Sequence, residues 1–178
     1  MKAQTEFIEW LRDAYAMEKG MELTLAQQRD DESAPPVFRE QAAQHCIETQ
    51  RHAEAVEACL RNLGADVSTL KTGFAQGVEF VKNADSGFAR DGHVRHLLMA
   101  YASEHFEIAC YTALRTGAER LGLVEFAQTC GQIIDEERRM AEWIEKHLPQ
   151  IVSAHLDFTE MHKSPAQKAR RFVEDIMR

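Results

Sequence analysis

The sequence contains few residues that interrupt helices. Its 178 residues include only four prolines and nine glycines. Proline breaks a helix interior and glycine weakens it, so most of the chain is free to form long helices. No useful stretch alternates apolar and polar residues as a half-buried strand does. The sequence therefore predicts an all-α protein.

Long apolar runs are also missing. No segment approaches the roughly 20 apolar residues of a membrane helix, and the N-terminal MKAQTEFIEW lacks the apolar core of a signal peptide. The four cysteines form no CxxC pair, and we expect buried free thiols instead of disulfides or a zinc site; they are Cys46, Cys59, Cys110 and Cys130. These absences predict a cytoplasmic protein with no membrane partner.

An excess of basic charge is absent as well. The net charge is −8 and the pI is about 5.5, and no long basic stripe occurs. A nucleic-acid partner is therefore not expected. The apolar fraction of 44% and the charged fraction of 28% are ordinary for a globular protein with a buried core.

Helical spacing of apolar residues appears four times along the chain. Paired prolines before the second helix suit a helix N-terminus, and Gly64, Gly122 and Pro149 stand where helices should end. The predicted helices span Thr5–Arg29, residues 36 to about 63, Gly92–Leu121 and Val124–Leu148.

The connections between these helices predict a fold. Short loops join the first pair and the second pair, and the long segment Ala65–Arg90, with a short helix near Leu70–Lys82, crosses between the pairs. One long crossover lets the second and third helices run parallel, as in a ferritin-like four-helix bundle. We expect residues 1–149 to form this bundle. Residues 150–178 should form an additional C-terminal helical extension packed on it, with Ser164-Pro165 starting a helix.

Each predicted helix carries a glutamate on its apolar stripe, and these are Glu18, Glu48, Glu107 and Glu137. A buried ionised carboxylate costs several kcal/mol unless a cation or a partner compensates it. Both pairs of hairpin glutamates are 30 residues apart, which places the four carboxylates at similar heights. Four such groups cannot all remain charged without cations. The pattern therefore predicts two bridged metal ions, iron or alternatively manganese.

Histidines add candidate nitrogen ligands on the second helix. His45 lies three residues before Glu48 and His52 lies four after it, and either could be a ligand or an outer partner. The fourth helix has no histidine within a turn after Glu137, which leaves one expected nitrogen ligand missing. Because a helix face is broad, three further carboxylates could each replace a chosen neighbour: Glu22, Glu104 and Glu136.

Four segments resemble YciF/YciE-type ferritin-like proteins, in the same order along the chain: WLRDAYAMEKG, HCIET, EHFEIACY and IIDEERRMAEW. The resemblance runs from Glu6 to His147. It implies a four-helix bundle, a homodimer, a di-iron or similar centre and a role in bacterial stress. The acidic positions of the family fall on Glu18, Glu48, Glu107 and the Glu136–Glu137 pair, and its histidine falls on His45.

Two functions from different classes follow. The first is a dimetal-carboxylate stress protein with two iron ions per chain that reacts with oxygen or peroxide, as an oxidase or peroxidase would. The second is a metal-free helical bundle that acts through oligomerisation or partner binding. Iron storage in a cage is a third possibility, which would need subunit contacts that one sequence does not reveal. The metal ligands predicted for the first are Glu18, Glu48, His52, Glu107, Glu137 and His45.

Overall fold

The computed structural model describes residues 2–32, 34–67 and 92–161, and these form four helices. They are α1 (Lys2–Asp30), α2 (Pro36–Asn62), α4 (Gly92–Leu121) and α5 (Val124–Met161). No strand occurs within these ranges. The all-α prediction is confirmed, and the predicted bounds hold to within a few residues except at the end of α5. The helix predicted near Leu70–Lys82 and the cap at Ser164 lie outside the described residues.

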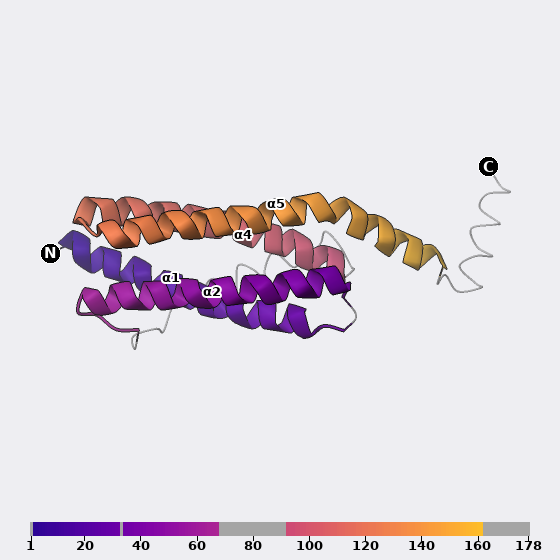
Figure 1. Cartoon of the computed structure of the whole chain (residues 1–178), viewed down its shortest axis with the longest axis horizontal. Coiled ribbons are helices and arrows are strands. Elements are labelled where there is room, and N and C mark those ends of the chain that lie inside the picture. The colour runs from indigo at the N-terminus through magenta and orange to yellow at the C-terminus, as the bar shows by residue number, and fades with distance from the viewer. Residues whose placement is uncertain (1, 33, 68–91, 162–178) are drawn as a thin grey trace.

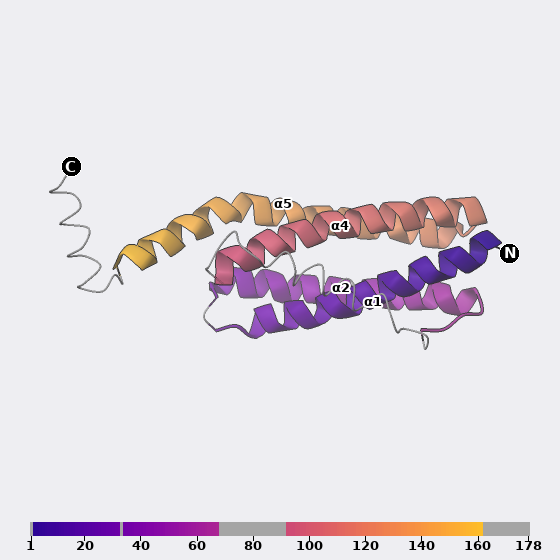
Figure 2. The same ribbon diagram turned by 180° about the vertical axis from the view of Figure 1, so that it is seen from behind.

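The four helices form a bundle of two hairpins (Figures 1 and 2). α1 packs closely along α2, and α4 packs closely along α5. The hairpins meet along two seams, where α1 faces α4 and α2 faces α5. α2 ends at one end of the bundle and α4 begins at the other, so both run in the same direction (Figure 1). This is the parallel arrangement predicted from one long crossover.

Glycine caps end α2 and α4 where the sequence predicts them. Gly64 has φ 71° and Gly122 has φ 74°, a left-handed conformation that a side chain disfavours. The backbone N–H of Ala65 donates to Leu60 O at 2.9 Å, and that of Leu123 donates to Ala118 O at 2.9 Å. These bonds satisfy carbonyls that a helix end leaves without partners.

The predicted end of the last helix at Leu148 is wrong. α5 continues through Pro149 to Met161 as one helix of 38 residues. Proline removes one helical hydrogen bond and tends to bend a helix, and α5 changes direction over its C-terminal part, which extends past the other helices (Figure 1). The predicted domain boundary at residues 149/150 therefore falls inside a helix. Residues 162–178 lie outside the described residues, and their packing on the bundle stays a prediction.

The apolar core is divided into two main parts along the bundle. One part surrounds Leu11, Leu60 and Leu114, and the other surrounds Phe38, Leu97 and Ile144. Between them in sequence lie the predicted metal-binding positions on all four helices. Cys46, Cys59 and Cys130 are buried free thiols and Cys110 is half-buried.

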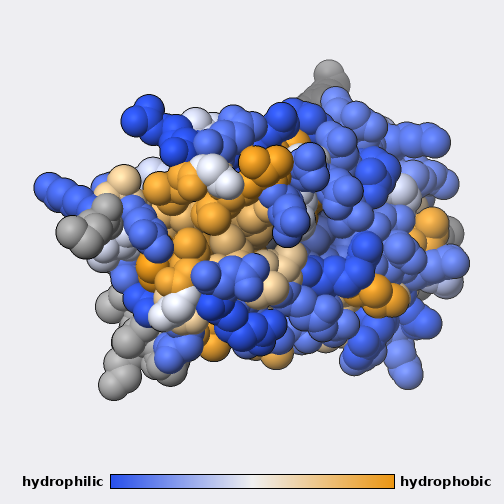
Figure 3. Space-filling view, turned by 60° about the vertical axis from the view of Figure 1, so that its left-hand side comes forward, coloured by the Kyte–Doolittle hydropathy of each residue, from blue (hydrophilic) through white to orange (hydrophobic). Residues whose placement is uncertain are grey.

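The surface is polar over most of the face seen in Figure 3, but apolar side chains gather where the end of the bundle comes forward. None of the described helices is long and apolar enough to cross a membrane.

Candidate metal centre

Six ionisable side chains are buried at the middle of the bundle. Among the described residues, the other buried side chains with a polar atom are Thr49, Tyr111 and three cysteines, and each of the six is at most 2% exposed. They come from all four helices: Glu18, His45, His52, Glu104, Glu107 and Glu137. Their atoms form two groups, each compact enough to hold one metal ion.

The first position consists of His45, Glu104, Glu107 and Glu137, which offer ligand atoms all within 4.8 Å of one another. His45 Nε2 lies 3.1 Å from Glu104 Oε2 and 3.3 Å from Glu137 Oε2. The spacing Glu104-x-x-Glu107 directs both α4 carboxylates to the same face, because residues three apart are neighbours on a helix. One imidazole and three carboxylates thus converge here.

The second position consists of Glu18, His52 and Glu137, also within 4.8 Å of one another. His52 Nδ1 lies 3.0 Å from Glu137 Oε1 and 3.6 Å from Glu18 Oε2. Glu137 therefore belongs to both positions, with one carboxylate oxygen near each histidine. This is the arrangement of a carboxylate that bridges two metal ions.

Each histidine uses its other ring nitrogen to contact a half-buried carboxylate. His45 Nδ1 lies 3.0 Å from Glu48 Oε2, and His52 Nε2 lies 2.7 Å from Glu136 Oε2. With the N–H on these nitrogens, each imidazole donates outward and keeps a lone pair for the interior. Such outer carboxylates fix the tautomer and orientation of metal-binding histidines.

Tyr111 completes the second position from α4. Its fully buried phenol donates a hydrogen bond to Glu18 Oε1 at 2.5 Å. Its ring meets the His52 ring edge-on, with the centroids 6.1 Å apart. Tyr111 therefore holds Glu18 with Oε2 left over for the second position.

Burial and proximity shift the pKa values of the whole cluster. Burial raises the pKa of Glu104 to about 8, despite its contact with His45, and raises the pKa of Glu107 well above its usual range. Burial alone would lower the pKa of His52, but Glu137 and Glu18 outweigh it and raise the value to about 10. Burial likewise opposes ionisation of Glu137, but its contacts with both histidines hold its pKa below the usual range.

The cluster leaves many buried atoms unsatisfied. Ten buried side-chain nitrogen or oxygen atoms of the described residues make no hydrogen bond of good geometry, and eight of them belong to the six cluster residues, where the ring nitrogens and carboxylate oxygens approach one another to 3.0–3.3 Å. They include both oxygens of Glu137, both oxygens of Glu104 and the inward nitrogens of the two histidines. Leaving such atoms unpaired costs about 1–3 kcal/mol each. Two metal ions would satisfy them, so the donor set fits such a group.

Five of the six residues predicted as ligands lie in the cluster: Glu18, His45, His52, Glu107 and Glu137. Glu48 does not, because its side chain is 14% exposed and contacts the outer face of His45. Glu104 takes the remaining place, although it was only an alternative to its neighbours. The fourth helix contributes no histidine to the cluster, as the sequence predicts, and both histidines come from α2. Whether these residues bind metal stays a prediction.

Equal spacing of glutamates placed the cluster only to within about a turn. Glu18 lies near His52, while Glu48 lies one turn away beside His45. When two glutamates of a hairpin are 30 residues apart, their heights along the bundle are similar but not equal. The loop geometry determines which turn of one helix faces which turn of the other.

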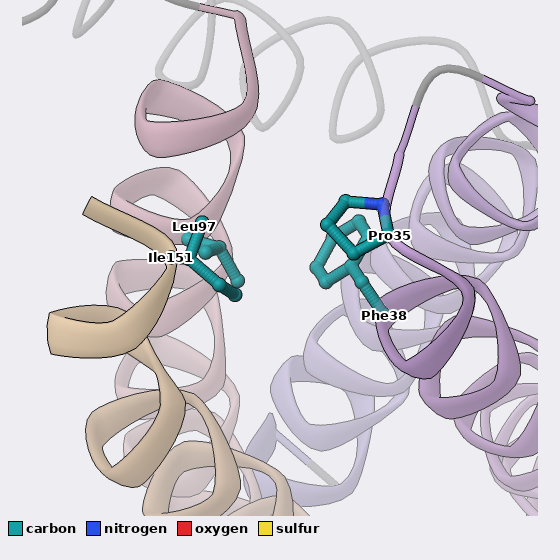
Figure 4. A pocket seen from close by; sticks show the side chains of 4 residues that line it. All are labelled: Pro35, Phe38, Leu97 and Ile151. Carbon is teal, nitrogen blue, oxygen red and sulfur yellow. The ribbon is translucent and has the colours of Figure 1, made fainter. Parts of the chain in front are cut away.

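A small surface pocket lies apart from this centre. Its lining residues are Pro35, Phe38, Leu97 and Ile151, near the N-terminal ends of α2 and α4 (Figure 4). All four side chains are apolar and offer no metal ligand.

Comparisons with known proteins agree with the fold. A solved structure from Xanthomonas campestris pv. campestris is 31% identical, with a TM-score of 0.73 over 89% of this chain and 99% of that chain. A structure described as ferritin-like, diiron-carboxylate proteins from Bacillus anthracis is 19% identical, with a TM-score of 0.68 over 83% and 99%. The E. coli stress protein YciF is 22% identical, with a TM-score of 0.66 over 86% and 99%.

A family model agrees with these structures. It is described as a domain of unknown function, DUF892, and it matches residues 2–157. Together with the likeness to YciF, the match confirms the YciF-type resemblance and the ferritin-like bundle that the sequence predicts. The chain belongs to the DUF892 family.

Proposed function

We propose that this chain is a dimetal-carboxylate protein that binds two iron ions at the centre of its bundle and reacts with oxygen or peroxide. The observation that carries the proposal is the position of Glu137, whose two oxygens lie 3.0 Å from His52 Nδ1 and 3.3 Å from His45 Nε2. A buried carboxylate between two imidazoles and further carboxylates is suited to bridge two cations.

The donor set favours iron, with manganese as the alternative. Two imidazoles and four carboxylates give an oxygen-rich site. Such a site binds hard divalent and trivalent cations better than soft cations. No cysteine belongs to either group of candidate ligands. The structure described as ferritin-like and diiron-carboxylate from Bacillus anthracis supports the same choice through its fold.

The protein residues would bind and orient the ions and exclude water. Bound iron would supply the redox and Lewis-acid chemistry for a small oxidant. Glu137 would hold both ions at a fixed separation, while Glu48 and Glu136 would fix the histidine rings. Tyr111 would keep its proton on the phenol oxygen and hold Glu18 in one orientation.

Elemental analysis after anaerobic Fe(II) loading tests the proposal. The wild type should retain about two ions per chain, and Glu137→Gln should retain almost none, because both positions lose their shared ligand. Glu142→Gln is the matched control, since Glu142 lies on the same helix but is exposed. Wild-type protein without metal, or with the same content as Glu137→Gln, would refute the proposal.

A metal-free bundle is the second candidate. The contacts of His45 with Glu104 at 3.1 Å and of His52 with Glu137 at 3.0 Å allow imidazolium and carboxylate charges to balance without a cation. In that case Glu137→Gln would leave the metal content unchanged at trace level. The homodimer, the cytoplasmic location and the stress role stay predictions.

A further inference from the structure

The two seams between the hairpins differ in how they connect the centre to the surface. Along the α1–α4 seam, Phe7 packs against Gly117, where an added Cβ would lie 2.7 Å from the Phe7 ring. The cluster residues of these helices, together with Tyr111, are at most 2% exposed: Glu18, Glu104, Glu107 and Tyr111. The cluster residues of α2 and α5 are equally buried, but Glu18 and Glu104 contact the buried residues Tyr111, His52 and His45.

The α2–α5 seam does reach the surface through charged side chains. Glu48 is 14% exposed and Glu136 is 19% exposed, and each contacts the outer nitrogen of one cluster histidine. These two carboxylates therefore link solvent to both candidate metal positions.

Two arginines lie beside Glu136. Arg51 Nη2 lies 3.5 Å from Glu136 Oε1, and Arg139 Nη2 lies 3.8 Å from the same oxygen. Arg139 also lies close enough to Glu48 to help lower the pKa of that carboxyl, after the larger effects of His45 and Gln44. Both arginines are more than half exposed, at 57% and 62%. Their pairs with Glu136 are consequently weak and can open at little cost.

We propose that divalent cations enter and leave the metal centre through the α2–α5 seam. Glu48 and Glu136 receive the arriving ion, because a cation crossing into a low-dielectric interior needs negative partners on its way. Arg51 and Arg139 form a gate, since each occupies Glu136 and repels an approaching cation. This inference rests on the proposed function and adds the route by which the ions arrive.

Opening the gate means that Glu136 exchanges an arginine for the cation. The ion then lies next to His52, whose inward nitrogen belongs to the second position. From there Glu137 leads to the first position, because its other oxygen lies near His45. A gate of this kind slows both uptake and release. A charge that merely disfavoured the bound ion would slow uptake and speed release.

Stopped-flow absorption with Co²⁺ tests the route. The variants are Arg51→Gln/Arg139→Gln, the single Arg139→Gln, Glu136→Gln and a matched control, Arg138→Gln. Arg138 is a suitable control because it is 58% exposed and forms its ion pair with Asp135, at 3.2 Å, instead of with Glu136. Release is measured by mixing loaded protein with excess chelator. Circular dichroism melting verifies that each variant folds.

We expect uptake and release to be about three- to tenfold faster in the double variant at low ionic strength, and less so at high ionic strength. Glu136→Gln should slow uptake, and Arg138→Gln should match the wild type. Unchanged rates in the double variant, slower release, or equal acceleration by Arg138→Gln would overturn the gate. Absence of Co²⁺ uptake by the wild type would instead overturn the proposed function, and the gate with it.

Discussion

Tyr111 donates its phenol hydrogen to one oxygen of Glu18 and leaves the other oxygen of that carboxylate facing His52 in the second candidate metal position. The hydrogen bond crosses from α4 to α1 and is wholly buried. Tyr111, which is not a predicted ligand, therefore fixes the orientation of Glu18, which is one.

Removing this phenol should weaken one metal position. In Tyr111→Phe, Glu18 loses its fixed orientation, and we expect the Co²⁺ affinity of the second position to fall about fivefold, in line with one hydrogen bond. Calorimetric titration would measure it, with Tyr101→Phe as the control, because Tyr101 is half-buried on the same helix and contacts His105. Equal loss at both positions would contradict the assignment of Tyr111 to the second.

Glu48 should tune metal binding without being essential to it. The sequence alone predicts Glu48 as a ligand, and its loss would then abolish binding. The structure instead places Glu48 on the outer nitrogen of His45. We therefore expect Glu48→Gln to keep about two ions per chain, with the ion at the first position bound about 10- to 100-fold more weakly. Competition with a chelator of known affinity measures this, and a complete loss of metal would return Glu48 to the ligand set.

The stability of the metal-free protein should fall as the pH rises from about 5 to about 9. Glu104 has a pKa of about 8 in the folded chain and His52 of about 10, both above their unfolded values, so the folded state holds more protons in this window. Glu137, with its lowered pKa, contributes a slope only at more acidic pH. Thermal unfolding in chelator at a series of pH values tests this, and a melting temperature that rises across the window would refute it.

The affinity for metal should change with pH in the opposite direction to the stability of the metal-free protein. Cations must displace the protons held by the cluster, so the affinity for Fe(II) or Co²⁺ should increase with pH over the same range. Titration in buffers of different ionisation enthalpy counts the released protons. Glu104→Gln should reduce that number, and binding without proton release would contradict the protonated state of the metal-free centre.

Two glycines give a matched test of packing. Gly117→Ala on α4 would place a methyl group 2.7 Å from the Phe7 ring, and we expect a loss of about 1–3 kcal/mol in the free energy of unfolding. Gly131→Ala on α5 meets only the flexible Arg115 side chain at 3.8 Å. It should stabilise the helix by up to about 1 kcal/mol. Urea unfolding of both variants measures the difference, and a stabilised Gly117→Ala would disprove the close approach of α1 to α4.

The sequence predicts most of this fold because its signals are local. The apolar stripes, the paired prolines before α2 and the glycines at residues 64 and 122 each act within one or two turns. Pro149 misled the prediction of the α5 end, because a helix can continue past a proline by bending. The sequence cannot show such a bend.

The candidate site was predictable in composition but not in detail. The stripe on α4 already contains both Glu104 and Glu107, so the pair could have been chosen over Glu107 alone. The place of Glu48 and Glu136 as outer partners of the two histidines could not be predicted. For Glu48 it depends on the rotation of α2 about its axis, which is set by packing against α5 and α1 and leaves this side chain 14% exposed.

Glu137 on one hairpin and the two histidines on the other have a consequence for assembly. Each hairpin can form from contacts near in sequence, whereas both candidate positions require groups from both hairpins. A chain with only one folded hairpin therefore presents no complete site. Metal binding would stabilise the state in which the two hairpins are packed together. The ions would then bind late in folding, after each hairpin has formed.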